Sequence, residues 1–451
     1  MKIAQDITVA SLEKKALRVF QVSAAKVETL DRRWNPASGS PVYTVRGQYT
    51  SRGWTEWTQG FQFGSAVLQF DATGDRRFLD IGREKTVSQM AKHVSHIGVH
   101  DHGFNNVSTY GNLLRLWHES RLGGNEWERH FYELALKSSA AVQAARWSRT
   151  SDGGGYIYSF NGPQSLFVDT IRTLRVLAIG HRLGHALMGE NDRRISLLER
   201  MIQHAQATAN YSVYYGKGRD IYDVRGRVAH ESIFNPNDGN FRCPNTQQGY
   251  SPVTTWTRGL AWAMCGFAEQ LEFLGTFDGD ELVPCGGRSR VEDLFRQAAE
   301  AACDFYIENT ALDGVPYWDT GAPGLYHLGE WRERVSEPLN AFEPVDSSAA
   351  AIAAQGLLRL GRHLKNDRYW RAGLTVCSTL FEEPYLSADP GHEGLLMHSI
   401  YHRPNGWDFI PEGHTIPCGE ASMWGDYHAR ELALYLLRIG ENKPYLTFWS
   451  E

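Results

Sequence analysis

Two carboxylic acids in the sequence have neighbours that suit proton transfer. Asp169 lies in the apolar stretch 166–171, where burial would raise the pKa of its carboxyl group and keep a proton available for donation. Asp101 lies between His100 and His102, a more polar setting in which a carboxylate can stay ionised. Two carboxyls with opposed surroundings can divide the acid and base roles that cleavage of a glycosidic bond requires. We therefore expect Asp169 to be an acid and Asp101 its ionised partner.

Aromatic residues are a second chemical signal. The chain contains 14 Trp and 20 Tyr among its 451 residues. Flat rings can stack on sugar faces, although most single tryptophans are core or rim residues. Aromatic and polar residues gather where apolar helices are expected to begin, and we expect them to share one pocket. An Asp at such a position can also be a simple N-cap. The gathered residues are Trp54, Trp57, His100, Asp101, His102, Asp169, Trp256, Arg258, Asp346, Glu420, Trp424 and Asp426.

The histidines do not form a metal-binding motif. His100 and His102 cannot share one face of a helix, and no pattern such as H-E-x-x-H includes them or the upstream His93 and His96. The 6 cysteines are far apart and include no C-x-x-C pair, so they suggest neither a disulfide scaffold nor a zinc site. We predict that the protein uses no metal and no organic cofactor.

Composition and charge exclude several classes of protein. The net charge of -6 gives no basic excess, which argues against a nucleic-acid partner. No apolar run reaches the length of about 18 residues that a membrane span requires, and no apolar signal core follows Lys2. We therefore expect a cytoplasmic enzyme without a membrane partner. The sequence does not fix the oligomeric state.

Helical periodicity recurs along the whole chain, whereas strand alternation is scarce. Asp75, Asp192 and Asp367 each stand where an Asp can cap the helix that follows, which suggests repeated hairpins. The twelve expected helices cover residues 8–34, 57–71, 76–96, 104–120, 125–147, 165–188, 192–210, 254–275, 289–309, 346–363, 367–382 and 420–438.

Two kinds of helix alternate in this pattern. Helix 289–309 is amphipathic, whereas segments 259–263 and 347–354 are apolar along their length and must be buried on all sides. Alternation of buried and half-buried helices predicts an all-α fold, an (α/α)6 barrel in which an outer ring surrounds an inner ring. An open α-solenoid is the alternative, because its helix pairs would also alternate.

The connections between the helices favour the barrel. The long irregular segments 211–253 and 310–345 would interrupt a solenoid, whereas the mouth of an enzyme barrel often carries such insertions. No linker rich in Pro or Ser divides the chain. We therefore expect residues 1–451 to form a single catalytic domain.

Several short motifs together resemble one family of enzymes. They resemble those of the unsaturated glucuronyl hydrolases, glycoside hydrolase family 88, to which the unsaturated rhamnogalacturonyl hydrolases are related. Each motif is weak alone, but they follow the order of the family. The motifs are Glu56-Trp57-Thr58-Gln59-Gly60-Phe61, Val99-His100-Asp101-His102-Gly103-Phe104, Phe167-Val168-Asp169-Thr170, Gln248-Gly249-Tyr250-Ser251, Thr255-Trp256-Thr257-Arg258-Gly259-Leu260-Ala261-Trp262, Pro316-Tyr317-Trp318-Asp319, Asp346-Ser347-Ser348-Ala349-Ala350-Ala351-Ile352 and Met423-Trp424-Gly425-Asp426-Tyr427.

The resemblance implies an (α/α)6 fold and a specific reaction. Members remove a 4,5-unsaturated uronic acid from the non-reducing end of oligosaccharides that a lyase has produced. By resemblance, Asp169 would donate a proton to C4 of the C4=C5 bond and activate the water that adds at C5, assisted by Asp101. The hemiketal would then open and expel the remaining sugar.

The resemblance also implies a set of substrate-binding residues. Two tryptophans would stack on or wall the sugar ring, and the arginine would help to hold the site, in one version through the uronate carboxylate. The histidine and the glutamine match positions near the reacting atoms. The set is Trp57, His230, Gln248, Arg258, Trp262 and Tyr401.

The chain departs from the family pattern at several positions. Arg172 and the residue after it replace Met-Asn, and Arg172 would lower the pKa of Asp169 if it faced the pocket. Leu260 replaces a Gln, and Val345 replaces an Arg. Segment 401–424 is longer than usual and lacks the Ser and Lys pattern that recognises sulfate in some members. We therefore expect an unsulfated substrate.

Three alternatives differ from this hypothesis in function. A glycosidase of different specificity on the same barrel would use Asp101 as base and Asp169 as acid. A sugar epimerase would depend on histidines, with His230 essential and Asp169 dispensable. A sugar-binding protein without activity would depend on neither carboxyl.

Overall fold

The computed structural model describes residues 1–51, 57–277 and 279–443, so Trp54 and Glu56 lie outside the described residues. The described helices form two layers. The inner layer consists of α2 (Gln59–Thr73), α5 (His102–Asn106) with its continuation α6 (Asn112–His118), α8 (Leu174–Arg182), α10 (Thr257–Leu274), α12 (Ser347–Leu364) and α14 (Met423–Gly440). The outer layer consists of α1 (Val9–Arg33), α3 (Arg76–Gln89) followed by the short α4 (Ala91–Ser95), α7 (Glu126–Ala145), α9 (Leu197–Ala207), α11 (Arg288–Glu308) and α13 (Asp367–Leu380).

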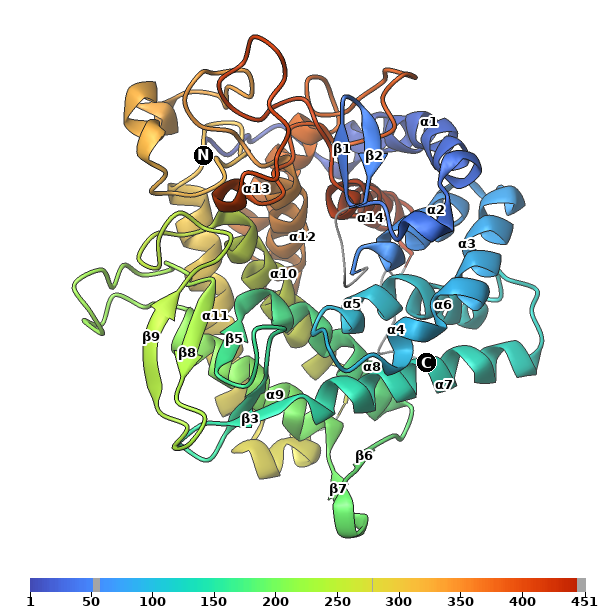
Figure 1. The fold of residues 1–451 in the computed structure, drawn as a ribbon, viewed down its shortest axis with the longest axis vertical. Coiled ribbons are helices and arrows are strands. Elements are labelled where there is room, and N and C mark those ends of the chain that lie inside the picture. Colours follow the sequence, from blue (N-terminus) through green and yellow to red (C-terminus); the bar gives the residue numbers. More distant parts are fainter. Residues whose placement is uncertain (52–56, 278, 444–451) are drawn as a thin grey trace.

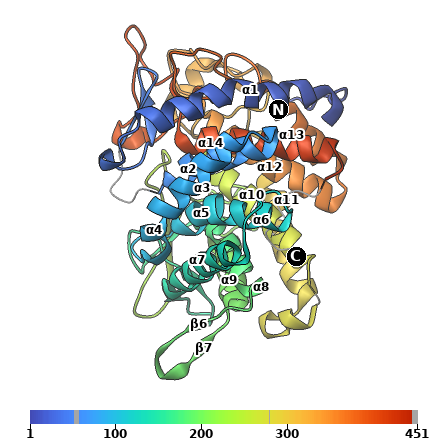
Figure 2. The same cartoon turned by 90° about the vertical axis from the view of Figure 1, so that its right-hand side faces the viewer.

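The inner helices form a closed ring. Each one packs against the next, and α14 returns to pack against α2, so the two ends of the colour scale meet in Figure 1. The outer helix α1 closes the same junction by lying against α14 and α2 (Figure 2). The predicted (α/α)6 barrel is confirmed. The open α-solenoid is wrong, because a solenoid would leave its first and last helices apart.

Burial explains why the two layers differ in composition. In the inner helix α10 every residue except Glu272 is buried, whereas the outer helix α3 buries only Phe78, Leu79, Gly82 and Thr86. Small residues let inner helices approach closely. A Cβ added at Gly356 of α12 would lie 2.8 Å from the backbone nitrogen of Cys265 in α10. The small apolar residues noted in the sequence therefore set the spacing of the ring.

Two predicted helices are wrong at their ends. Helix 165–188 begins instead as strand β5 (Ser165–Phe167), continues as a 3-10 turn (Val168–Thr173), and ends at Arg182. The reason is tertiary, because β5 pairs with a strand more than 60 residues later in the chain, and such pairing overrides local propensity. The C-terminal end of predicted helix 165–188 and the start of predicted helix 192–210 instead form a hairpin of strands β6 (Leu187–Met188) and β7 (Arg194–Ile195). This hairpin projects from the body of the protein in Figure 1.

The predicted capping residues are partly wrong. Asp75 caps α3 as expected, since its carboxylate accepts a hydrogen bond of 3.1 Å from the backbone nitrogen of Arg77. Ser196 rather than Asp192 caps α9, and Asn366 rather than Asp367 caps α13. Asp, Ser and Asn all favour the N-cap position, so sequence alone does not choose between neighbours.

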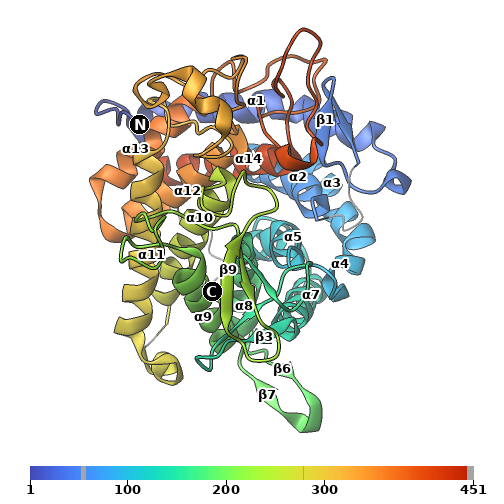
Figure 3. The same ribbon diagram turned by 60° about the vertical axis from the view of Figure 1, so that its left-hand side comes forward.

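Short strands lie outside the two helical layers, and one three-stranded sheet lies next to the candidate site. Strand β5 pairs antiparallel with β8 (Glu231–Phe234), which pairs with β9 (Phe241–Asn245). This sheet lies beside the π-helical extension of α9, Thr208–Ser212 (Figure 3). The remaining strands form two hairpins, β1 (Tyr43–Val45) with β2 (Gln48–Thr50) and β3 (Trp147–Arg149) with β4 (Gly155–Ile157).

Among the described helices, none combines enough length with enough apolar character to cross a bilayer.

Candidate active site

A pocket with a cavity volume of about 230 Å³ opens near the beginnings of several inner helices. Its described lining is mainly aromatic, with carboxyl, amide and imidazole groups among the rings. The lining residues are Trp57, His100, Asp101, Phe104, Phe160, Phe167, Asp169, Gln247, Gln248, Trp256, Arg258, Trp262, Tyr401, His402, Asn405 and Trp407. The structure thus brings together both predicted carboxyls and five of the six predicted substrate-binding residues.

The small sheet positions the residues of one wall. Phe167 at the end of β5 lies opposite Glu231 at the start of β8, and Glu231 lies opposite Asn245 at the end of β9. Asp169, His230 and Gln248 follow or precede these strand ends by a few residues, so the register brings them to one edge. Glu231 is buried, and its carboxylate accepts hydrogen bonds from Ser165 Oγ, Asn161 Nδ2 and Asn245 Nδ2.

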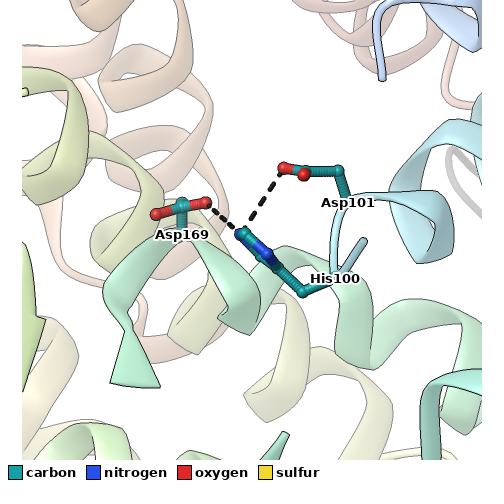
Figure 4. A group of neighbouring side chains, drawn as sticks. All are labelled: His100, Asp101 and Asp169. Carbon is teal, nitrogen blue, oxygen red and sulfur yellow. Dashed lines mark hydrogen bonds and ion pairs between the residues drawn. The ribbon is translucent and has the colours of Figure 1, made fainter. Parts of the chain in front are cut away.

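His100 connects the two carboxyls. Its Nε2 lies 3.0 Å from Asp169 Oδ2 and 3.6 Å from Asp101 Oδ1 (Figure 4). Asp101 immediately precedes α5, so the start of an inner helix presents this pair to the 3-10 turn that carries Asp169. The side chains of Asp101 and Asp169 are 13% and 10% exposed, which means that both carboxyls are nearly buried but reach the pocket.

The predicted difference between the two carboxyls is reversed in this structure. Burial raises the pKa of Asp169, but the hydrogen bond and the charge of His100 outweigh burial and hold this pKa below its ordinary value. Burial raises the pKa of Asp101 to about 6, although the charge of His100 opposes the rise. The expectation of a raised pKa at Asp169 is therefore wrong, and Asp101 has the higher pKa of the two carboxyls. The hydrogen bond from His100, which joins distant parts of the chain, causes the difference.

His230 lies behind the pocket wall rather than on it. Its Nδ1 accepts hydrogen bonds from the backbone nitrogens of Gln247 (3.0 Å) and Gln248 (3.4 Å), so the proton of the neutral ring is on Nε2. Burial lowers the pKa of His230 to about 4, which keeps the ring neutral. Its Nε2 lies 3.8 Å from Asp169 Oδ1, and it therefore points an N–H group at the second oxygen of the carboxylate.

Arg258 connects several parts of the pocket wall by hydrogen bonds. Its guanidinium donates to Asp346 (3.1 Å), to Gln248 Oε1 (2.8 Å), and to the backbone carbonyls of Ile400 and Tyr401. The terminal N–H groups of Arg258 thus have protein acceptors in this structure, and its contact with the uronate carboxylate stays a prediction. The bond to Gln248 Oε1 instead leaves the Nε2 amide of Gln248 as the donor available to a ligand.

Stacked rings form the aromatic part of the wall. Trp57 stacks on the buried Trp424 with ring centroids 5.0 Å apart, and Trp262 stacks on Phe104 at 6.1 Å. Tyr401 packs on Trp407 at 5.3 Å. Rings that are fixed on one side and open on the other are suited to holding a sugar face.

Five described residues of the predicted gathering do not line the pocket. His102 is buried, and its Nε2 lies 2.9 Å from His96 Nδ1. Asp346 caps α12, and Asp426 accepts a hydrogen bond of 2.8 Å from Tyr49 Oη. Glu420 accepts from the backbone nitrogen of Gly47, and Trp424 lies behind Trp57. The simpler expectation is therefore correct for Asp346, an N-cap, and for Trp424, a core residue, whereas Ser422 rather than Asp426 caps α14.

Sequence reasoning missed part of the lining. Gln247, His402, Asn405 and Trp407 carry no helical pattern, and Phe160 lies in the connection between β4 and β5. The unusual length of segment 401–424 was the only signal that could have indicated three of them.

Comparison with known proteins gives a consistent result, although no family model matches the chain. An unsaturated glucuronyl hydrolase of Bacillus sp. (strain GL1) is 27% identical over 426 residues, which cover 90% of this chain and 92% of that protein. One from Formosa agariphila is 24% identical over 384 residues, 83% of this chain and 78% of the relative. A solved unsaturated glucuronyl hydrolase specific for heparin has a TM-score of 0.72 at 18% identity, covering 95% of this chain and 98% of the other.

The predicted resemblance to the unsaturated glucuronyl hydrolase family is confirmed. The structural likeness supports the barrel fold.

Three of the departures from the unsaturated glucuronyl hydrolase pattern, Arg172, Leu260 and Val345, lie outside the pocket. Arg172 is buried, its Nε lies 3.1 Å from Glu269, and its guanidinium lies 5.5 Å from the Trp262 ring. It does not face the pocket, so the condition under which it would lower the pKa of Asp169 is not met. Leu260 and Val345 are core residues.

The three residues of Figure 4 are also the described group that could accept a cation. One potential ligand atom from each of His100, Asp101 and Asp169 lies within 4.8 Å of the others. In this structure His100 Nε2 and Asp169 Oδ2 face each other at hydrogen-bonding distance rather than a common centre.

Proposed function

We propose that the chain removes a 4,5-unsaturated uronic acid from the non-reducing end of lyase-generated oligosaccharides. The observation that carries this proposal is the meeting of Asp101 and Asp169 on His100 in an aromatic pocket. The chain is a glycoside hydrolase, as are relatives named unsaturated glucuronyl hydrolase and unsaturated chondroitin disaccharide hydrolase. A solved neighbour holds an oligosaccharide that begins with dGlcA, at 22% identity.

The reaction is hydration of a vinyl ether. Asp169 donates a proton to C4 of the C4=C5 bond, which leaves positive charge shared between C5 and the ring oxygen. The carboxylate partner Asp101 stabilises this charge, since it faces the same His100. Asp169 then takes a proton from the water that adds at C5, and the resulting hemiketal opens and releases the remaining sugar.

The other pocket residues position the substrate. Trp57 and Trp262 present rings that can stack on the uronate, with Tyr401 beside them. Gln248 offers an amide donor because Arg258 occupies its oxygen, and His230 directs an N–H group at Asp169. No step of this reaction requires a metal or an organic cofactor.

A test follows the conjugated double bond in the ultraviolet. An unsulfated unsaturated uronyl disaccharide loses its near-ultraviolet absorbance when C4=C5 is hydrated. We expect the purified protein to remove this absorbance while the second sugar is released. Release of the sugar with the absorbance retained would contradict the proposal.

The distance between the two carboxyls indicates which alternative function is the second candidate. The ligand atoms of Asp101 and Asp169 are within 4.8 Å, which is shorter than the about 6.5–9.5 Å that inverting glycosidases use to place a water. The spacing is nearer to the about 5–5.5 Å of retaining enzymes. Direct displacement by a retaining glycosidase is therefore the alternative, and the absorbance test separates it from hydration.

Two finer assignments accompany the proposal. We assign the chain to glycoside hydrolase family 88 on the order of its motifs. We also place it in the cytoplasm, which agrees with six cysteines that are all free thiols. Cell fractionation would test the location, and recovery of the protein outside the cytoplasm would contradict it.

A further inference from the structure

One ring nitrogen of His100 faces both reactive carboxyls. His100 Nε2 lies 3.0 Å from Asp169 Oδ2 and 3.6 Å from Asp101 Oδ1, and the histidine side chain is only 1% exposed (Figure 4). The first distance is a hydrogen bond, and the second needs a shift of under 1 Å to become one. Small movements of a single group therefore decide which carboxyl His100 contacts.

The surroundings hold the His100 ring in this position. Phe160 stacks on it with ring centroids 5.9 Å apart, and Phe167 meets it edge-on at 5.5 Å. The hydroxyl of Thr173 donates to the backbone carbonyl of His100. The other ring nitrogen, Nδ1, is buried and has no hydrogen-bond partner among the described residues. Exchange of a proton with neighbours therefore proceeds through Nε2.

The proposed reaction requires a proton on Asp169, the carboxyl that lies at hydrogen-bonding distance from His100 Nε2. Burial raises the pKa of Asp101, so this group keeps its proton more readily, whereas Asp169 is held ionised by His100. The proposed function assigns the first proton donation to Asp169. A proton must therefore pass from Asp101 to Asp169 before C4 is protonated.

We propose that His100 relays this proton from Asp101 to Asp169. The inference rests on the proposed function. The Nε2–H bond breaks as Asp169 Oδ2 takes its proton, which leaves a neutral ring with a free lone pair on Nε2. The Asp101 O–H bond then breaks as Nε2 takes that proton, which gives an Asp101 carboxylate and restores the imidazolium. The net result is the passage of one proton from Asp101 to Asp169, no electron transfer occurs, and the total charge of the three groups is unchanged.

The relay leaves each group in the state that the chemistry needs. Asp169 is then the protonated acid, and Asp101 is the carboxylate that stabilises the developing positive charge. His100 acts through the two carboxyls and is therefore a positioning residue for them.

Other titratable groups around His100 do not supply the proton. His230 beside Asp169 and His204 on α9 are neutral, because burial lowers their pKa values to about 4 and about 3. Arg146 at the end of α7 donates to the carbonyls of Tyr158 and Ser159. Among the described residues, Asp101 and Asp169 are the acids whose charges act on His100.

The first experiment does not depend on activity. Nuclear magnetic resonance of the full chain with labelled histidine would follow the pKa of His100 in the wild type and in Asp101→Asn and Asp169→Asn. We expect the His100 pKa to fall by about one unit or more in both variants, because each carboxyl favours the imidazolium. His181, which pairs with Glu281 on the surface, is the unchanged internal reference. A fall in only one variant would overturn the relay, because His100 would then serve one carboxyl alone.

The second experiment uses chemical rescue. His100→Gln retains a donor for Asp169 but cannot carry a proton, so we expect kcat on an unsaturated disaccharide to fall about 10²- to 10³-fold with KM changed less than about threefold. His100→Ala leaves a space between Phe160 and Phe167, and added imidazole should restore part of its kcat. His181→Gln is the matched control and should keep wild-type activity.

The outcomes separate the relay from the reaction. A folded His100→Gln variant with wild-type kcat, or a folded His100→Ala variant that imidazole does not rescue, would overturn the relay. Wild-type protein that leaves the ultraviolet absorbance of the disaccharide unchanged would overturn the proposed function, while the resonance measurement would still decide whether His100 couples both carboxyls.

Discussion

At the scale of residues, the chemistry depends on contacts between distant parts of the chain. The motifs identify Asp101 and Asp169, and local composition correctly predicts that Asp169 is largely buried but does not predict the burial of Asp101. Local composition did not predict which carboxyl has the higher pKa. His100 donates to Asp169 across 69 residues of sequence, and this bond outweighs the apolar neighbours of Asp169. Predicting which of the two carboxyls has the higher pKa therefore requires the three-dimensional contacts, whereas identifying the two acids requires only the sequence.

The raised pKa of Asp101 predicts a stability effect with a definite sign. A carboxyl whose pKa rises from 3.8 to about 6 on folding stabilises the protein below its unfolded pKa, and this contribution is lost as pH rises through about 6. Asp101→Asn should therefore raise the free energy of unfolding at pH 8 by up to about 3 kcal/mol, with little effect at pH 4. Urea unfolding at both pH values would measure this. Asp6→Asn, at an exposed position, is the control, and equal effects at the two pH values would contradict the account.

Removal of metal ions should not affect the reaction. His100, Asp101 and Asp169 are close enough to accept a cation, but the proposed steps use them only for proton transfer. We expect kcat to be unchanged, within about twofold, after dialysis against EDTA. Recovery of lost activity on adding back magnesium, calcium or zinc would show that the group of Figure 4 works as a metal site instead.

At the scale of elements, helices were more predictable than strands. The periodicity of α10 and α12 reflects burial on all sides, and both were found within a few residues of their bounds. Strands β5, β8 and β9 were not predicted, because each has five residues or fewer and gains its stability from pairing. These strands position Asp169, His230 and Gln248. The elements that the sequence did not predict are therefore those that build one wall of the site.

Glu231 is predicted to fix this small sheet. Its buried carboxylate holds Ser165 and Asn161 on one side and Asn245 on the other. Glu231→Ala would leave these groups without their acceptor, and we expect a loss of about 2 to 4 kcal/mol in the free energy of unfolding. Activity should also fall, because His230 is the preceding residue. Glu231→Gln keeps part of the acceptor function and should lose less; equal losses for the two variants would contradict the assigned role.

At the scale of the whole molecule, the closed ring explains how distant motifs form one site. The inner helices run side by side, so their N-termini lie at the same end of the barrel. Helices α14 and α2 pack together although they lie near opposite ends of the sequence. The alternation of fully buried and half-buried helices was enough to predict this ring, and no knowledge of contacts between residues was needed. We propose that residues 1–451 act as one domain on this basis.

The interior of the ring contains a buried charge pair that the sequence pattern did not predict. Arg172 contacts Glu269 at 3.1 Å, and both side chains are at most 2% exposed. Arg172→Met would restore a family residue but leave the carboxylate of Glu269 with less compensation, so we expect a loss of about 3 to 5 kcal/mol. Thermal unfolding would measure it. The double variant Arg172→Met with Glu269→Gln should recover part of the loss, and full stability of the single variant would contradict the role of the pair.

The most direct test of the central claim compares wild type with Asp169→Asn on an unsulfated unsaturated uronyl disaccharide. Asp169→Asn removes the proton donor while preserving the shape of the side chain, and thermal unfolding would verify that the variant is folded. The account predicts that wild type abolishes the near-ultraviolet absorbance and that the variant does so at least about 10²-fold more slowly. A folded Asp169→Asn protein that consumes the double bond at the wild-type rate would contradict it.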